Sequence, residues 1–419
     1  MSARAWLVSV LAAGSIPAQA QSVLIRDATV HTVSAAGVLE HTDILIRDGR
    51  VAELGAHLAV PQGAQVIEAA GRAVTPGFFG GIGHVGMEEI GQEPSVADYA
   101  LKLGAMRPEF DVSLAFDAEG TVLGVNRTRG VTFAQLAPSS EAGRKGEGGS
   151  IVSGQGAVAR FDGTLAAGRA LFIETGGGAN KLSGGSRAAQ FMLLEQAITE
   201  VRQPQLVLAS DARLLTPAGR RVFAGYLKGG GPVVFDADHA ADIRRIVGLA
   251  RREHLHVVIR GGAEAWRLGP QLAAAGIPVV LDPLVDLPDS FDAVGSTLEN
   301  AARLERAGVK IAFSFGDPAP HSMFKLRQGA GVAVAHGLPY EAALAAMTRD
   351  PAQVFGVDDR NGSIERGRPA DLVLWSGDPL EVSSLADEVF IQGVRQSMRS
   401  RQTELRDRYL PKVLSHSAR

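Results

Sequence analysis

Two aspartates near the end of an apolar run have a spacing that allows joint chemistry. Asp236 and Asp238 follow the run beginning at Val233 and lie two residues apart. Residues two apart on a β-strand share a face, and two carboxylates on one face can bind Mg²⁺ or Ca²⁺ through oxygen. Asp238 also precedes a predicted helix beginning at Ala240, and aspartate commonly caps a helix start. The pattern favours capping for Asp238 and a site role for Asp236.

A glycine-rich motif matches a nucleotide-binding pattern without its helix. Gly154–Ala159 fits G-x-G-x-x-A, and Glu174 lies about 20 residues downstream, where an acid that binds ribose belongs. Asp162 and Gly163 interrupt the segment in which the crossover helix should form. The sequence therefore predicts a glycine-rich loop here rather than a dinucleotide site.

Short β runs and helical stretches alternate from residue 75 to about residue 347. This alternation predicts a parallel sheet with helical crossovers. Its length suits a (β/α)8 barrel, with an open doubly wound sheet as the alternative. The expected strands are 131–133, 170–174, 233–236, 256–259, 279–281 and 309–315, and the expected helices are 188–202, 240–252, 263–275, 297–307 and 340–348.

Strand patterns flank this body on both sides. Residues 22–75 contain short alternating runs, with a hairpin turn at Arg47–Arg50, and the tail has β runs at 370–375 and 389–392. We therefore expect a β-sandwich domain assembled from residues 21–75 and 355–419 beside a barrel of residues 76–354.

Composition limits the classes of function. The chain has 419 residues, of which 46% are hydrophobic and 21% charged, typical of a folded globular protein. A net charge of -3 and 5% aromatic residues argue against nucleic acid as a partner. The absence of cysteine excludes disulfides and thiolate metal sites. No run approaches the length of a membrane span. The expected partner is a small-molecule substrate or ligand.

The first residues have the pattern of a signal peptide. Arg4 provides a positive charge, Ala5–Ile16 is an apolar stretch, and Ala18–Ala20 forms a small-x-small cleavage site. The sequence therefore predicts export to the periplasm, with cleavage of the signal peptide after Ala20.

Several short sequence motifs resemble those of the amidohydrolase superfamily, and of imidazolonepropionase-like members in particular. They are AVTPGF at Ala73–Phe78, GVT at Gly130–Thr132, AGVKIA at Ala307–Ala312, and GSIERGRPADLVL at Gly362–Leu374, followed by GDPL at Gly377–Leu380. The resemblance covers nearly the whole chain after the signal peptide. It implies a (β/α)8 barrel, a β-sandwich built from both termini, and hydrolysis of carbon–nitrogen bonds other than peptide bonds.

The resemblance also implies a divalent metal at the barrel mouth, and several expected ligands are replaced. Ile82 stands where the first histidine of an H-x-H pair belongs, and Gly316 stands where the general-base aspartate belongs. The resemblance then implies at most one divalent ion, zinc or another, which is weakly held or absent. The candidates are His84 and Asp236 as metal ligands, Asp317 and Arg260 as catalytic residues, and Glu174, Asp238 and His239 as substrate-binding residues.

Arg260 offers a replacement for the missing metal charge. Through the resemblance, Arg260 ends the sixth strand and Asp236 the fifth, so their side chains can meet if both point inward. An arginine is always protonated and binds carboxylates. Three hypotheses follow: a hydrolase with an unusual metal site, a metal-free enzyme using Asp236, Arg260 and Asp317, or a non-catalytic barrel that binds a small molecule or partner.

Overall fold

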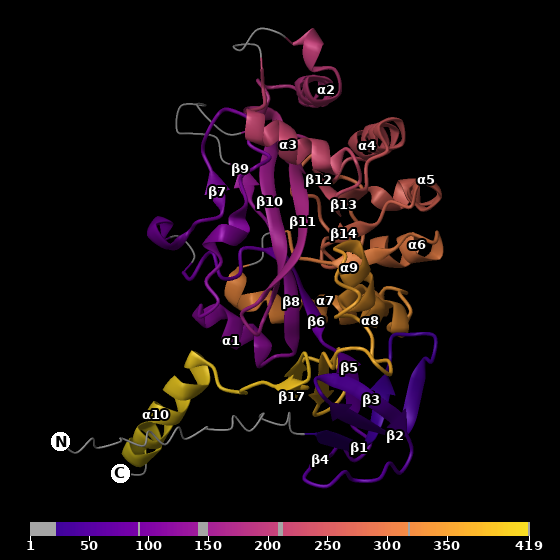
Figure 1. The fold of residues 1–419 in the computed structure, drawn as a ribbon, viewed down its shortest axis with the longest axis vertical. Coiled ribbons are helices and arrows are strands. Elements are labelled where there is room, and N and C mark those ends of the chain that lie inside the picture. Colours follow the sequence, from indigo (N-terminus) through magenta and orange to yellow (C-terminus); the bar gives the residue numbers. More distant parts are fainter. Residues whose placement is uncertain (1–21, 91–92, 141–149, 208–212, 317–318, 418–419) are drawn as a thin grey trace, which may run out of the picture.

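Two eight-stranded sheets organise the chain. The computed structural model describes residues 22–90, 93–140, 150–207, 213–316 and 319–417. One sheet, the terminal sheet, combines strands from both ends of the chain. The other, the barrel sheet, carries the site. Figure 1 shows the terminal sheet below the barrel sheet, with the last helix extending away from both.

The terminal sheet unites segments some three hundred residues apart. Its order is β18-β17-β16-β5-β1-β2-β3, with β4 beside β1. The predicted hairpin forms, since Arg47 pairs with Arg50, and Asp48 and Gly49 have φ angles of 52° and 75°. The strands are β1 (Val23–His31), β2 (Val38–Arg47), β3 (Arg50–Gly55), β4 (Gln65–Glu68), β5 (Ala73–Pro76), β16 (Leu372–Trp375), β17 (Ala386–Ile391) and β18 (Val394–Arg395).

The barrel sheet is nearly closed and gives a TIM-like barrel. Its strands lie in sequence order from β6 to β15. The first strand contacts the end of the last one, because the Ile82 amide donates to Oγ of Ser314, the residue after β15, at 2.9 Å. The strands are β6 (Phe78–Gly83), β8 (Val131–Leu136), β10 (Val152–Arg160), β11 (Leu165–Glu174), β12 (Val233–Ala237), β13 (Val257–Gly261), β14 (Val279–Leu281) and β15 (Ile311–Phe313).

The predicted glycine-rich loop is wrong, because its residues form strand β10. This strand pairs antiparallel with both β8 and β11, so the barrel departs here from a regular (β/α)8 pattern. The glycines allow close packing: a Cβ on Gly154 would lie 2.5 Å from the Phe110 carbonyl oxygen, and one on Gly156 would lie 2.2 Å from the Leu136 carbonyl oxygen. No helix separates β10 from β11, which agrees with the rejection of a dinucleotide fold.

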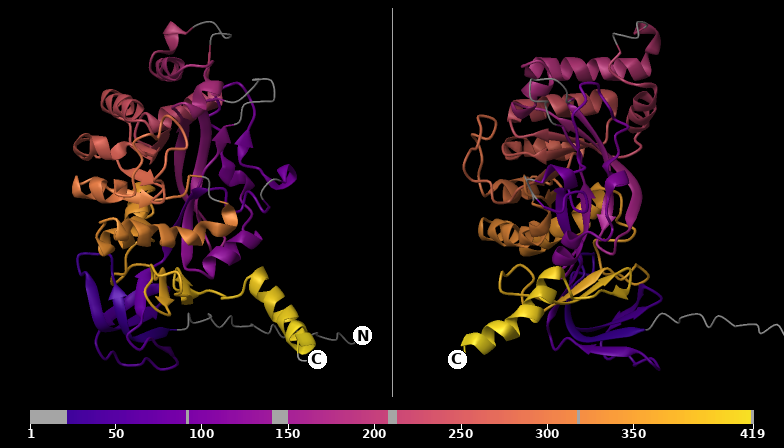
Figure 2. Two further views of the ribbon diagram at one scale, coloured as in Figure 1. Left: turned by 180° about the vertical axis from the view of Figure 1, so that it is seen from behind. Right: turned by 90° about the vertical axis from the view of Figure 1, so that its left-hand side faces the viewer.

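Helices cover one side of the barrel strands (Figure 2). On α4, Ile243, Ile246, Val247 and Ala250 are all buried, as their helical spacing predicts. No helix in the described ranges is long and apolar enough to cross a membrane. The α-helices are α1 (Thr121–Arg127), α2 (Arg187–Arg202), α3 (Pro217–Tyr226), α4 (Ala240–Glu253), α5 (Gly269–Ala275), α6 (Asn300–Arg306), α7 (Leu326–Ala335), α8 (Tyr340–Met347), α9 (Arg349–Val354) and α10 (Arg401–Ser417).

A short parallel pair lies outside the two main sheets. Strand β7 (Ala100–Leu101) pairs with β9 (Ser139–Ser140). Ser139 lines the cavity described below, so this small pair brings one more polar residue to the site.

Candidate active site

Three ionisable side chains stand in one row across adjacent barrel strands. Asp236 on β12 is in register with Glu174 on β11 and with Arg260 on β13. Side chains two residues apart on a strand share a face, so the charged row continues a row that fills the barrel interior. The interior residues two positions earlier are Phe172, Val234 and Val258.

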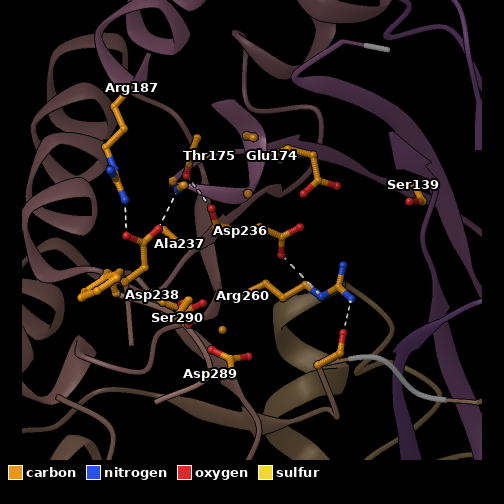
Figure 3. Close-up of a pocket in the computed structure, with 18 of the residues that line it drawn as sticks. Ser139, Glu174, Thr175, Arg187, Asp236, Ala237, Asp238, Arg260, Asp289 and Ser290 are labelled. Carbon is orange, nitrogen blue, oxygen red and sulfur yellow. Dashed lines mark hydrogen bonds and ion pairs between the residues drawn. The ribbon is translucent and has the colours of Figure 1, made fainter. Parts of the chain in front are cut away.

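Arg260 and Asp236 meet at the carboxyl ends of their strands, as expected. The guanidinium Nε lies 3.5 Å from Asp236 Oδ1, and Arg260 Nη2 donates to the Gly316 carbonyl oxygen at 3.2 Å (Figure 3). The side chains are 18% and 26% exposed, so water screens the pair only in part. Both residues line a cavity of about 710 Å³ at the barrel mouth, together with Glu174 and His84.

Glu174 is the member of this row whose surroundings favour the protonated form of its carboxyl group. Burial, followed by the charge of Asp236 and a hydrogen bond with it, raises the pKa of Glu174 to about 8. Ser153 Oγ donates to Glu174 Oε1 at 3.1 Å. Ser153 lies on β10, so the antiparallel strand that the sequence analysis missed supplies a residue that orients the acid.

His84 follows β6 and is neutral. Its ring stacks on Tyr99, with ring centroids 3.6 Å apart and an angle of 5° between planes. Burial, and secondarily the positive charge of Arg260, lowers the pKa of His84 to about 4. The Nδ1 atom lies 3.8 Å from Glu88 Oε2. The imidazole can therefore exchange hydrogen bonds with a ligand but carries no charge at neutral pH.

The described side chains at the barrel mouth do not fit a multi-ligand metal centre. Ile82 is fully buried among apolar residues inside the barrel. Asp236 already faces the cationic Arg260. Across the part of the chain that the structure describes, no three His, Cys, Asp or Glu side chains come together as metal ligands. Zinc sites in proteins usually need three or four such ligands.

Asp238 lines the cavity and does not cap α4, so the predicted capping is wrong. Its Oδ1 accepts the Ala263 amide at 3.1 Å, after β13. Burial is the main cause that raises the pKa of Asp238 to about 6. The amide of Ala240 instead donates to Glu264 Oε2 at 3.0 Å. The long side chain of Glu264 reaches the helix start from a distant segment, which local sequence does not reveal.

His239 lies beside the cavity rather than among the residues that line it. It occupies the N-cap position of α4 without a capping bond from its side chain, and its Nε2 is 3.9 Å from Glu264 Oε2. Asp317 lies outside the described residues, so its predicted catalytic role stays a prediction. The neighbouring Gly316 does line the cavity.

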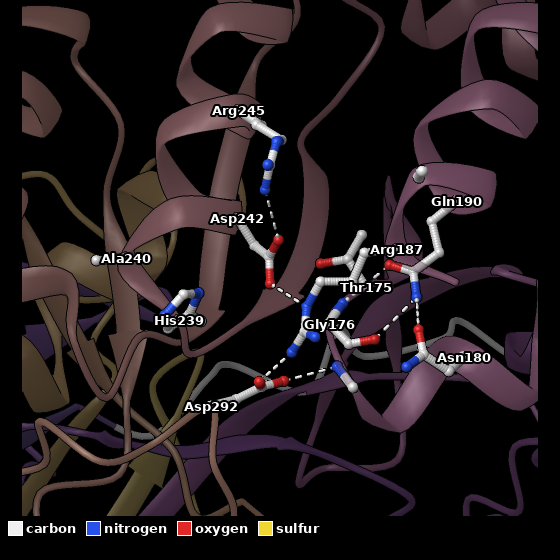
Figure 4. Close-up of polar contacts among 12 residues, drawn as sticks. Thr175, Gly176, Asn180, Arg187, Gln190, His239, Ala240, Asp242, Arg245 and Asp292 are labelled. Atoms are coloured by element: carbon white, nitrogen blue, oxygen red, sulfur yellow. Dashed lines mark hydrogen bonds and ion pairs between the residues drawn. The ribbon is translucent and has the colours of Figure 1, made fainter. Parts of the chain in front are cut away.

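Arg187 is a cavity residue that the sequence analysis missed. Its Nε donates to Asp242 Oδ2 at 2.9 Å, and its Nη2 pairs with Asp292 (Figure 4). The Gly177 amide donates to the other oxygen of Asp292 at 2.6 Å. These contacts anchor the loop after β14 to the glycine-rich segment after β11. Arg187 directly precedes the predicted helix 188–202 and is the first residue of α2. Nothing in the local sequence distinguishes it from a solvent-exposed arginine.

Comparisons with known proteins agree with this fold. Residues 229–399 match the model of the amidohydrolase family. Imidazolonepropionase of Acidiphilium cryptum (strain JF-5) is 27% identical over 376 residues, which cover 82% of this chain and 89% of that protein. The amidohydrolase tasK of Hapsidospora irregularis is 46% identical over only 61 residues, which span 15% of this chain and 6% of that protein.

A solved structure shows the same architecture. The amidohydrolase from Thermotoga maritima MSB8 has a TM-score of 0.78 and 26% identity, covering 90% of this chain and 100% of that chain. This chain combines a barrel with a sheet built from both termini, and the barrel has a polar cavity at the carboxyl ends of its strands. The chain belongs to the amidohydrolase superfamily.

Proposed function

We propose that this chain is an exported hydrolase of the amidohydrolase type that cleaves a carbon–nitrogen bond other than a peptide bond, with Arg260 supplying positive charge at the barrel mouth. The observation that carries the proposal is the row of Glu174, Asp236 and Arg260 in register within one cavity. The similarity to imidazolonepropionases supports the reaction class.

The charged row provides an acid, a base and a cation for such a reaction. The Asp236 carboxylate accepts a proton from water as the water oxygen bonds to the substrate's carbonyl carbon. Arg260 stabilises the negative charge that develops on the carbonyl oxygen. Glu174 then gives its proton to the leaving nitrogen as the carbon–nitrogen bond breaks. Proton transfer from Asp236 to Glu174 restores both groups.

This proposal is tested by amine or ammonia release from a panel of cyclic amides, ureides and N-acyl amines. Activity is expected to survive dialysis against a mild chelator. Glu174→Gln is expected to lower kcat by about 100-fold, because a positioned general acid contributes on that order. The matched control is Glu195→Gln, whose carboxylate is 53% exposed and lies outside the cavity. Equal activity of both variants would contradict the acid role.

A non-catalytic ligand-binding protein is the second candidate. It is favoured by the lack of three converging metal ligands among the described residues. Binding without turnover of any compound in the panel would support this candidate over the hydrolase.

Metal analysis gives a separate prediction. The purified protein is expected to carry no tightly bound binuclear zinc centre, because Ile82 is apolar and Asp236 faces Arg260. Elemental analysis after dialysis against a mild chelator measures this directly. A stoichiometric pair of zinc ions on each chain would show that ligands outside the described residues complete a centre.

Export is also a proposal, carried by the pattern in residues 1–20, which lie outside the described residues. Exported protein is expected to begin at Gln21, because Ala18–Ala20 has the small residues of a cleavage site. Intact-mass measurement of protein from the periplasmic fraction identifies the terminus. A chain that retains Met1 in that fraction would contradict cleavage.

A further inference from the structure

The cavity wall carries more negative than positive side chains. Two guanidiniums line it, and each already has a carboxylate partner: Arg260 faces Asp236, and Arg187 pairs with Asp242 and Asp292. Asp238 and Asp289 also line the cavity, and neither forms an ion pair with another described residue. The negative charges of Asp236, Asp289 and Asp292 act on Asp238. Each of these carboxylates therefore repels the Asp238 carboxylate.

An aromatic residue lines the same cavity as these carboxylates. Phe291 lines the cavity although it is 94% exposed. Its neighbour Asp292 is anchored by the Gly177 amide and by Arg187. Further along the same loop, the Gly295 amide donates to Glu264 Oε1 at 3.0 Å, and Trp266 Nε1 donates to the Gly295 carbonyl oxygen at 2.9 Å. The loop therefore holds an uncovered phenyl ring at the cavity entrance.

The ring and the carboxylates together match one ligand chemistry. The face of a phenyl ring attracts cations, and this attraction grows when water is excluded. A metal ion would gain nothing from the ring, and the described residues do not assemble three metal ligands. A protonated amine or a guanidinium uses both features, since it bonds to carboxylates and can lie against a ring.

We propose that the outer wall of the cavity, formed by Asp238, Asp289 and Phe291, binds an organic cation, namely a protonated amine or guanidinium. That this group belongs to the substrate rests on the proposed function, whereas the binding itself does not require hydrolysis. In Figure 3, Asp238 and Asp289 are drawn on one side of Asp236 and Glu174 on the other. The residues that bind the cationic group therefore differ from Glu174 and Arg260, which act on the carbon–nitrogen bond in the proposed reaction.

A matched pair of neutral and cationic probes tests this assignment. N-acetyl-L-arginine amide carries a guanidinium, and N-acetyl-L-citrulline amide replaces it with an uncharged ureido group of similar shape. Calorimetry with the full chain is expected to show about tenfold tighter binding of the arginine probe, since a cation–π contact and two nearby carboxylates together contribute on that order. Asp289→Asn and Phe291→Leu are each expected to reduce this preference about threefold.

Two positions on the same loop provide controls. Asp286 and Leu287 are exposed and lie outside the residues that line the cavity. Asp286→Asn and Leu287→Ala are expected to keep the full preference for the arginine probe. Equal affinity for both probes, including no measurable binding of either at millimolar concentration, would overturn the proposal. So would an equal loss of preference in the control variants.

The same measurements separate this proposal from the hydrolase proposal. Preference for the arginine probe in a protein that hydrolyses nothing in the panel would uphold the cation site and contradict the enzyme. Hydrolysis with no preference between cationic and neutral compounds would uphold the enzyme and contradict the cation site.

Discussion

Arg260→Ala is expected to lower the free energy of unfolding by about 2 kcal/mol. Removing one partner of a buried ion pair costs about 3–5 kcal/mol, while an exposed pair contributes about 0–1 kcal/mol. Arg260 and Asp236 are partly buried, which places this pair between those limits. The loss arises because Asp236 is left beside Glu174 without its cation. Chemical denaturation at neutral pH measures the change.

Further variants test whether charge is the cause. Arg260→Ala combined with Asp236→Asn is expected to recover part of the stability, because no carboxylate then lacks its partner. Arg360→Ala is the control, since Arg360 and Asp359 are 51% and 72% exposed and should change stability by about 0.5 kcal/mol or less. Arg260→Ala should also raise the pKa of His84, which Arg260 helps to lower. A loss as small as in the control would reject the charge-replacement hypothesis.

Asp371→Asn is expected to make the protein more stable than the wild type at pH 8. Asp371 is 2% exposed and lies where the terminal sheet meets the barrel. Its Oδ2 accepts a hydrogen bond from Thr132 Oγ1 at 2.9 Å and another from Asn361 Nδ2. Burial is the main cause that raises the pKa of this carboxyl to about 7. The structure therefore favours the protonated acid, which the amide of asparagine resembles.

The sign of the pH effect follows from linkage. An unfolded aspartate has a pKa of about 3.9, so from about pH 4 to pH 7 the folded chain retains a proton that the unfolded chain has lost. The contribution of Asp371 to the free energy of unfolding falls as pH rises through this window and is constant above it. The total loss is on the order of 2–4 kcal/mol.

Urea unfolding of the wild type and Asp371→Asn at pH 5 and pH 8 measures this effect. The variant should gain relative to the wild type between the two pH values. Asp359→Asn is the control, because that carboxylate is exposed on the surface. The same difference between Asp371→Asn and the wild type at both pH values would contradict a raised pKa at Asp371.

Local patterns in the sequence predicted many of the elements that position the site. Strand β12 (Val233–Ala237) and helix α4 (Ala240–Glu253) lie where alternation and helical spacing place them. The hairpin at Arg47–Arg50 forms because Asp48 and Gly49 adopt left-handed conformations that suit such a turn. These features depend on neighbouring residues, so one segment contains the information needed.

The errors concern residues whose surroundings come from distant parts of the chain. Gly154 and Gly156 suggest a loop, yet they permit the close approach of Phe110 and Leu136 to strand β10. Asp238 has the local signature of a cap, but Glu264 takes that role from another segment. In each case the deciding contact lies far away in sequence.

The sequence alone determined the residue types of this site and the alternation of strands and helices. Its short sequence motifs also indicated the superfamily. Only the tertiary structure decided which charges meet. Barrel closure and strand register place Asp236 between Glu174 and Arg260. The same packing buries Glu174 enough to keep its proton and brings Phe291 and Asp289 to the cavity entrance. Electrostatic and packing energies depend on distances between side chains, and those distances are set when separated strands come together.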